Sequence, residues 1–465
     1  MEKEYIIQGI AEQEELTPEM FCGLFEEKKY SEIKALTAKM TSPDIAEIFD
    51  NIPPKYATLM FRLLSKESAA EVFVEMETDS QRQLIESFTD RELSEILSEL
   101  YIDDTVDLIE EMPANVVKRI LNYSSSDDRA AINQILLYPK DSAGTVMTTE
   151  YVRLRAEMTV KDALVHIRRV AIDKETIYTA YVTDSNKRLL GIVTAKKLLL
   201  SDLDTVLSDI MDENVISVNT HDDKEDVALK FDKYGFIAMP VVDNEHRLVG
   251  IVTVDDAISV MMEESEEDFA KMAAITPTET PYLKTSIWSI WKSRIPWLLL
   301  LMLSSTISSA ILTGFESALP AVLVLFVPMI MGTGGNSGGQ SSVTVTRSIS
   351  LLEVDFRDLP KVFWKELRIG IMCGVALGAV TFGKVMLVDH FLMQNEAVTL
   401  SVAAAISLSL MLTIIAAKIL GGSLPLLAKK IGLDPAVMAS PLITTVVDAV
   451  SLIVYFYVSS SILTL

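Results

Sequence analysis

Cysteine and histidine are scarce in this 465-residue chain. The two cysteines, Cys22 and Cys373, lie in different halves of the sequence, so neither a disulfide framework nor a cysteine-based metal site is expected. The four histidines are scattered, and the sequence contains no phosphate-binding loop, nucleophile elbow or paired His–Glu metal motif. These absences make an enzyme the least favoured class of protein.

Positive charge is also in short supply, with 41 Lys and Arg against 65 Asp and Glu and a formal net charge of −24. From Lys284 onward there are 12 Lys and Arg against 9 Asp and Glu, a net charge of +3, so the preceding 283 residues carry −27. Such a region cannot neutralise phosphates, which argues against a nucleic-acid partner. The acidity serves solubility or binds divalent cations, and the near-neutral apolar remainder indicates a fused membrane region.

Five long apolar stretches follow Lys284, and each is near or above the roughly 20 residues that a spanning helix requires. They are Ile295–Phe315, Ser317–Thr346, Ile369–Gly383, Ala397–Ala417 and Pro435–Leu465. Lys and Arg gather around the loops after the second and fourth stretches, so the positive-inside rule places the N-terminal half in the cytoplasm and the C-terminus outside. The polar N-terminus, which lacks the pattern of a signal peptide, supports the same orientation.

One charge, Asp448, falls within the last apolar stretch. A carboxylate at this depth is costly unless it faces a pore or a partner. It is either hydrogen-bonded to a neighbouring helix, with Thr444 and Thr445 close in sequence, or a ligand for a cation. Mg²⁺ is a hard ion that keeps much of its water and is held by one or two carboxylates, so a two-fold dimer with both copies of Asp448 on its axis would make the better site.

The second stretch contains an unusual run of glycines, GTGGNSGGQ (332–340). In a membrane, small residues indicate close helix packing, or alternatively a broken helix whose carbonyls line a cavity. Asn336 and Gln340 are spaced i,i+4 and could share one face of a helix. Asp434, in GLDPA (432–436), is expected to cap the last segment with Pro435 at the first helical position, a role compatible with a place at the pore mouth.

A tandem repeat occupies roughly residues 145–262, where YVTDSNKRLLGIVT recurs 59 positions later as PVVDNEHRLVGIVT. The pattern predicts, in each copy, a strand, a turn at the Asp, a second strand ending in GIVT, and a helix. These copies resemble the CBS module. In that module an Asp three residues after the strand-ending Thr often holds a ribose; the second copy has Thr253 and Asp256, whereas the first has Lys197. A nucleotide such as ATP is therefore compatible with one of the two clefts.

Residues 1–140 show no strand pattern but contain short amphipathic segments, each too short to be stable alone. The segments are 45–53, 69–76, 92–100 and 105–113. Stacked helix hairpins in a superhelix are the natural solution. Asp103 and Asp107 are spaced i,i+4, where like charges repel, so they are either exposed to solvent or bridged by a divalent cation. After the repeat, an acidic cluster at 263–268 predicts a charged helix leading to the membrane region.

Taken together, these segments resemble one family, the MgtE magnesium channels. The resemblance rests on YPKDSAGTVMT (138–148), GIVTVDDAI (250–258), ESEED (264–268), GTGGNSGGQ, GLDPA and PLITTVVDAVSL (441–452). It implies a multidomain chain with an all-α superhelical N domain, an α/β CBS-domain pair and an all-α five-helix transmembrane domain. The implied boundaries are 1–140 for the N domain, 141–262 for the CBS pair, 263–284 for an acidic connecting helix and linker, and 285–465 for the transmembrane domain.

The resemblance further implies a homodimeric Mg²⁺-selective channel in the bacterial cell membrane, with Mg²⁺ as both substrate and regulatory ligand. The implied pore residues are Asp448, Asp434, Asn336, Gln340 and Thr444. Cytoplasmic Mg²⁺ would close the gate by bridging a set of acids, which here are Glu71, Asp103, Asp107, Asp223, Glu225, Asp256, Glu264, Glu267 and Asp268. Gly235 and Ser259 stand where the family can carry acids, which implies fewer or weaker regulatory ions.

Two rival functions fit the same residues. A gradient-coupled secondary transporter of divalent cations such as Mg²⁺ and Co²⁺ could use Asp448 as a proton relay. A membrane-anchored nucleotide sensor would need only the CBS pair. The glycine-rich segment and Asp448 argue against the sensor, because a membrane anchor requires neither.

Overall fold

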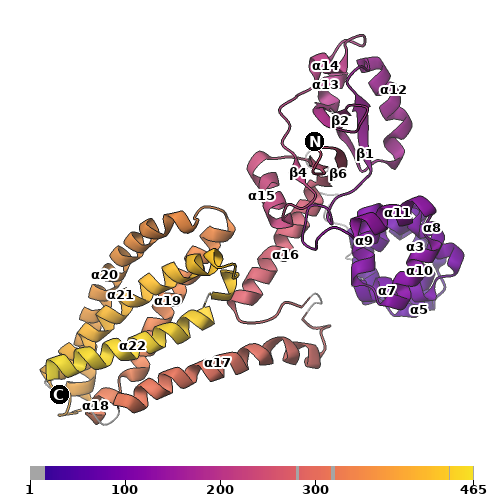
Figure 1. Cartoon of the computed structure of the whole chain (residues 1–465). Helices are drawn as coiled ribbons and strands as arrows, with labels where there is room; N and C mark the ends of the chain where they lie inside the picture. The colour runs from indigo at the N-terminus through magenta and orange to yellow at the C-terminus, as the bar shows by residue number, and fades with distance from the viewer. Residues whose placement is uncertain (1–15, 279–281, 316–319, 439, 464–465) are drawn as a thin grey trace, which may run out of the picture. The chain divides into compact units, whose positions relative to one another are not determined.

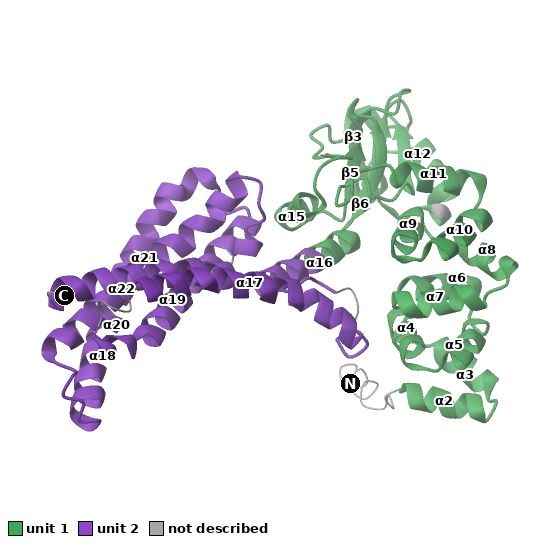
Figure 2. Ribbon diagram, turned by 60° about the horizontal axis from the view of Figure 1, so that its bottom comes forward, with its two compact units in different colours: residues 1–261 green, residues 262–465 purple. Residues whose placement is uncertain are grey.

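The computed structural model describes residues 16–278, 282–315, 320–438 and 440–463. The chain forms two compact units, residues 1–261 and 262–465, which are described separately (Figure 2). The first 15 residues, the last two, and residues 317–319 of the second expected apolar stretch lie outside the described part of the chain.

The N-terminal part of the first unit is a stack of short helices, each of eight to ten residues (Figures 1 and 2). After the first two helices, which pack on each other, helices pack mainly on the helix two positions along the chain, as α4 does on α6 and α5 on α7, which gives the predicted stack of hairpins. The helices are α2 (Pro18–Glu26), α3 (Tyr30–Thr37), α4 (Ser42–Asn51), α5 (Pro54–Phe61), α6 (Lys66–Val74), α7 (Thr78–Ser87), α8 (Asp90–Leu97), α9 (Ile102–Glu111), α10 (Ala114–Tyr123) and α11 (Ser126–Ile135).

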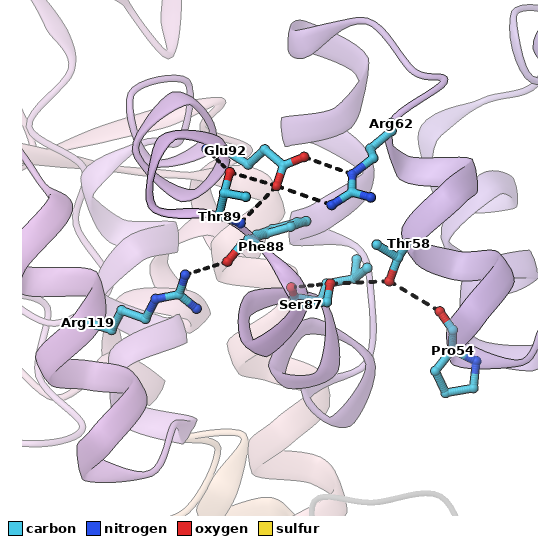
Figure 3. Close-up of polar contacts among 9 residues, drawn as sticks. Pro54, Thr58, Arg62, Ser87, Phe88, Thr89, Glu92 and Arg119 are labelled. Carbon is cyan, nitrogen blue, oxygen red and sulfur yellow. Dashed lines mark hydrogen bonds and ion pairs between the residues drawn. The ribbon is translucent and has the colours of Figure 1, made fainter.

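Polar contacts connect successive layers of this stack at a nearly constant sequence separation (Figure 3). Arg62 donates to Glu92 at 2.8 Å, 30 residues along, and Thr58 donates to Ser87 at 3.2 Å, 29 residues along. Glu92 also closes a capping box with Thr89 at the start of α8. The constant separation shows that one helix pair forms the repeating unit of the stack.

The CBS pair forms two three-stranded sheets of the same design, β1-β2-β3 and β4-β5-β6, in which the first two strands are parallel and the last two antiparallel. The first copy contains β1 (Tyr151–Arg155), α12 (Val160–Val170), η1 (Ala171–Asp173), β2 (Thr176–Thr183), β3 (Leu189–Thr194), α13 (Ala195–Leu200) and α14 (Leu207–Ile210). The second contains β4 (Val218–Asn219), α15 (Lys224–Tyr234), β5 (Ala238–Val242), β6 (Leu248–Thr253) and α16 (Val254–Met272).

The two turns predicted at Asp184 and Asp243 have the same local structure. Each carboxylate accepts hydrogen bonds from two backbone N–H groups of its own turn, at 2.8 to 3.0 Å. Lys187 and His246, which correspond in the two copies, both take a positive φ of 65° and 63°. The predicted order of strand, turn, strand and helix is therefore confirmed in both copies.

The second unit holds five helical segments long and apolar enough to cross a membrane, which confirms the five predicted spans. Its elements are α17 (Ile287–Phe315), α18 (Ala321–Val324), α19 (Val327–Ser350), η3 (Phe356–Asp358), α20 (Leu359–Lys384), the π-helical η4 (Val385–Leu392), α21 (Leu400–Lys430), η5 (Ala436–Met438) and α22 (Ser440–Leu463). Several helices are longer than the predicted stretches because residues with charged side chains extend them beyond the apolar part. Long charged side chains at these ends can reach the membrane surface.

The glycine-rich segment is a continuous helix, α19, so it is not the broken helix that was one of the two alternatives. Its glycines provide close packing against α21 and α22. A Cβ added at Gly421 of α21 would overlap the carbonyl oxygen of Gly338, and one added at Gly334 would lie 2.7 Å from Ser451 Oγ. Glycine is therefore required at these positions for the helix backbones to approach one another.

A candidate cation pathway and its acidic surroundings

Asp448 lies on α22 against the glycine-rich helix. A Cβ added at Gly335 of α19 would lie 2.9 Å from Cγ2 of Thr444 and 3.7 Å from Oδ1 of Asp448. That Asp448 oxygen is buried and has no hydrogen-bond partner within the described residues. Thr445, considered as a partner from the sequence, instead donates to the Pro441 carbonyl at 3.3 Å. The carboxylate thus has an oxygen that no neighbouring hydroxyl satisfies.

Asn336 and Gln340 are both exposed on α19, one turn apart, as their spacing predicted. Oε1 of Gln340 accepts a hydrogen bond from Nζ of Lys418 at 3.0 Å. Lys418 is only 6% exposed. The sequence placed Lys418 at the edge of the fourth span, but α21 continues for twelve more residues to Lys430, so the lysine is inside the helix bundle.

Glu366 is a second buried charge that sequence reasoning missed. It lies on α20, is 7% exposed, and accepts a hydrogen bond from the Ser341 hydroxyl at 2.6 Å. It precedes the apolar core of the third predicted span and was therefore assigned to the loop. A count of α20 from its first residue, Leu359, would have placed Glu366 two turns inside the helix.

Asp434 has two partners, one for each carboxylate oxygen. Oδ1 accepts from the backbone N–H of Ala436 at 2.8 Å, so Asp434 caps the short turn η5. The prediction that it caps the last spanning helix is therefore wrong. α22 begins at Ser440, since Pro435 starts the separate turn. Oδ2 of Asp434 accepts from Nζ of Lys271 on α16 at 2.7 Å.

Lys271 also bonds Glu267 at 2.7 Å, so one ammonium group links two of the predicted acids, Glu267 and Asp434. Burial alone would lower the pKa of Lys271, but the hydrogen bonds that it donates to Asp434 and Glu267 raise the pKa above its ordinary value. Next to it, Asp268 accepts from the Ser350 hydroxyl at 2.9 Å. Burial raises the pKa of Asp268, and the charge of Asp434 adds to the effect. No pattern in the sequence indicated a role for Lys271.

A buried group of acids lies in the first unit, around the start of α9. Burial raises the pKa of Asp103 well above its ordinary value, and the charges of Asp104 and Asp256 add to this. Burial likewise raises the pKa of Asp104 to about 6 and that of Glu175 to about 7, with Asp256 the strongest charged neighbour of both. One oxygen each of Asp103 and Glu175 is buried without a hydrogen-bond partner in the described chain. Asp104 and Glu175 were not among the predicted residues.

The other predicted regulatory acids are in varied surroundings. Asp107 is exposed, whereas Asp103, one turn earlier on the same side of α9, is buried near Asp104, Asp256 and Glu175. Glu71 accepts from the Ser42 hydroxyl at 2.8 Å. Asp223 caps α15 by accepting from the Glu225 N–H at 2.9 Å, and Asp256 accepts from the Thr253 hydroxyl. Glu264 is half-buried on α16. In the described ranges, no three His, Cys, Asp or Glu side chains are arranged as a ready metal site.

Family models match successive parts of the chain. A family model described as divalent cation transporter (MgtE) matches residues 327–458, the MgtE intracellular N domain matches 40–141, and CBS domains match 143–204 and 207–263. The magnesium transporter MgtE of Thermus thermophilus is 36% identical over 422 residues, covering 90% of this chain and 92% of that protein. The chain belongs to the MgtE family.

Two further similarities support membership of the MgtE family. The magnesium transporter MgtE of Bacillus subtilis is 31% identical over 444 residues, covering 94% of this chain and 95% of the relative. The crystal structure of the soluble part of a magnesium transporter aligns with a TM-score of 0.50 and 31% identity, covering 53% of this chain and 98% of that one. The expected fold class is thus confirmed for this MgtE chain, a multi-pass membrane protein whose family is described as a transporter.

Proposed function

We propose that this MgtE chain conducts Mg²⁺ across the cell membrane along a pathway lined by Asp448, Thr444, Asn336 and Gln340. The observation that carries the proposal is the buried oxygen of Asp448 without a partner, which lies against Gly335. A buried carboxylate oxygen without a partner destabilises the apo protein, and a passing cation would remove that penalty. Mg²⁺ exchanges its water reluctantly, so a single carboxylate is suited to a hydrated ion.

The pathway is incomplete in one chain, and we propose that a two-fold dimer completes it. Asn336 and Gln340 are exposed on a spanning helix, where contact with lipid would leave the amide of Asn336 and the amide N–H groups of Gln340 without hydrogen bonds. A second copy would cover these amides and bring a second Asp448 to the same axis. Because Lys and Arg gather in the loops after the second and fourth spans, we also propose that the N-terminal half lies in the cytoplasm and the C-terminus outside.

Regulation by cytoplasmic Mg²⁺ follows from the buried acids of the first unit. Asp103, Asp104, Asp256 and Glu175 repel one another when all are ionised, and a divalent cation would neutralise them. Because the described residues hold no preformed metal site, binding would require these side chains to turn toward the ion. High Mg²⁺ would thereby favour a closed state that binds the ion better.

The helix α16 is suited to carry this change, because it has Asp256 near its start and Lys271 near its end. Fifteen residues of helix separate them, about 22 Å at 1.5 Å per residue. Lys271 bonds Asp434, which follows the fourth span. We also propose the second CBS copy as the site for a nucleotide such as ATP, since Thr253 and Asp256 are held together at the end of β6.

Flux into liposomes tests the proposal. Purified wild-type protein would be reconstituted with an internal Mg²⁺ dye at a clamped membrane potential, with no proton or sodium gradient. We expect Mg²⁺ entry in wild type, its loss in Asp448→Asn, and its retention in Glu353→Gln, which removes an exposed carboxylate of the same unit. Entry that requires a proton or sodium gradient would instead support a coupled transporter of divalent cations such as Mg²⁺ and Co²⁺.

A further inference from the structure

The buried ammonium of Lys418 is unusual for a protein that passes cations. Roughly 18 Å of helix separates it from Lys430 at the end of α21, so its side chain cannot be explained as the end of a spanning helix. The partner that the structure gives it is a neutral group, the amide oxygen of Gln340, at 3.0 Å. A charge held inside a membrane bundle is costly, and such residues usually serve a function.

Lys418 contacts the proposed pathway through that partner. Gln340 is exposed on α19 on the same face as Asn336. Asp448 lies beside Gly335, which precedes Gln340 by five residues, so the two positions of α19 next to Asp448 and Lys418 are about 7.5 Å apart along the helix. Since α19 ends toward the cytoplasm in the proposed orientation, an inward-moving ion would pass Asp448 first and then the level of Lys418.

The packing of α19 against α21 does not depend on the contact between Lys418 and Gln340. The backbones of α19 and α21 already touch at Gly338 and Gly421, where no side chain separates them. A hydrogen bond between two helices could be made by a neutral side chain without the cost of a buried charge. The positive charge itself therefore needs an explanation.

We propose that Lys418 determines how tightly the pathway holds a divalent cation, acting as a fixed positive charge on the cytoplasmic side of Asp448. The inference rests on the proposed function. Conduction requires binding that is favourable enough for entry but weak enough for release. Electrostatic repulsion scales with the charge of the ion, so Lys418 weakens Mg²⁺ binding twice as strongly as binding of a monovalent cation.

The buried carboxylate of Glu366 limits this effect. It lies against Gly422, where an added Cβ would be 2.7 Å from Glu366 Cγ, and Gly422 is one turn from Lys418 on α21. Glu366 is hydrogen-bonded to Ser341 rather than paired with the lysine. The carboxylate therefore lies near the lysine and offsets part of its positive charge, without forming an ion pair with it among the described contacts.

The test is the dependence of liposome flux on Mg²⁺ concentration for full-length wild type, Lys418→Gln and Lys418→Arg. The matched control is Lys429→Gln, which removes an exposed positive charge from the last turn of the same helix. We expect Lys418→Gln to lower the half-saturating Mg²⁺ concentration by about 10-fold, because a divalent ion and a fixed positive charge roughly 6 Å apart in a water-filled pathway repel by about 1.4 kcal/mol. The saturating flux should also fall because release slows. Lys418→Arg and Lys429→Gln should keep the wild-type half-saturation.

A half-saturating concentration for Lys418→Gln equal to that of Lys429→Gln would overturn the proposal, since a structural tie alone changes only the amount of active protein. If Lys418→Gln does not assemble, Gln340→Glu is the alternative variant, because it keeps the lysine and cancels its charge. Gln340→Glu should also lower the half-saturating Mg²⁺ concentration, and an unchanged concentration would overturn the proposal equally. Absence of Mg²⁺ flux in wild type would instead refute the proposed function on which the role of Lys418 rests.

Discussion

Glu175 offers the sharpest test of the idea that buried acids in the first unit are held at an energetic cost. It stands immediately before β2, half-buried, with Oε2 lacking a hydrogen-bond partner among the described residues. Burial raises its pKa to about 7, and the charges of Asp256, Asp255 and Asp104 add to the shift. Glu175→Gln keeps the shape of the side chain and removes its charge.

The magnitude follows from the pKa. Each tenfold change in proton affinity corresponds to about 1.4 kcal/mol, so a rise from 4.5 to about 7 corresponds to roughly 3 kcal/mol for a fully buried group. Solvent screening at this half-buried position reduces the expected cost of the ionised form to about 1–2 kcal/mol. Because the folded state binds the proton more tightly, stability rises as pH falls from about 7 toward 4.5 and is lost as pH rises through 7.

At pH 8 without Mg²⁺, Glu175→Gln should therefore stabilise its surroundings by about 1–2 kcal/mol, whereas near pH 4.5 the gain should vanish. Hydrogen exchange of the β2 segment (Thr176–Thr183) in the full-length protein measures the local opening free energy. Glu157→Gln is the control, because Glu157 is an exposed acid in the turn after β1. Saturating Mg²⁺ should reduce the difference between wild type and Glu175→Gln. Equal protection in Glu175→Gln and Glu157→Gln at pH 8 would refute the reasoning.

Two further predictions concern the membrane unit. Gly421→Ala places a methyl group against the carbonyl of Gly338 and should lower the stability of the unit by about 1–3 kcal/mol. Gly332→Ala, with nothing within 4 Å of the added carbon, should leave the stability unchanged. Thermal unfolding monitored by tryptophan fluorescence compares the two variants, and equal midpoints would contradict the packing argument. Lys271→Met removes the contacts to Glu267 and Asp434 and should lower the free energy of opening at the end of α16 by up to about 1 kcal/mol. Hydrogen exchange at low Mg²⁺ measures this free energy, and unchanged exchange would show that the contacts do not stabilise the end of the helix.

Several features of this protein were predictable from the sequence because they depend on local or periodic patterns. The five spans follow from apolar length, since a helix must cross a hydrocarbon layer of fixed thickness. The two CBS copies follow from a repeat at 59 residues, and the stacked N-terminal helices from short amphipathic segments. Asp448 was identifiable because a single charge in an apolar stretch needs no knowledge of its neighbours to stand out.

Other features were decided only by the tertiary structure. Asp103 and Asp107 share one side of α9, as any i,i+4 pair does, yet Asp103 is buried and Asp107 is exposed, because segments distant in the sequence cover Asp103 and leave Asp107 in water. Lys418 looked like a loop residue until α21 proved to continue past it. The contact of Lys271 with Asp434 joins residues 163 positions apart. A sequence shows which side chains carry charge, but the cost of that charge and its partner depend on the solvent that folding removes around it.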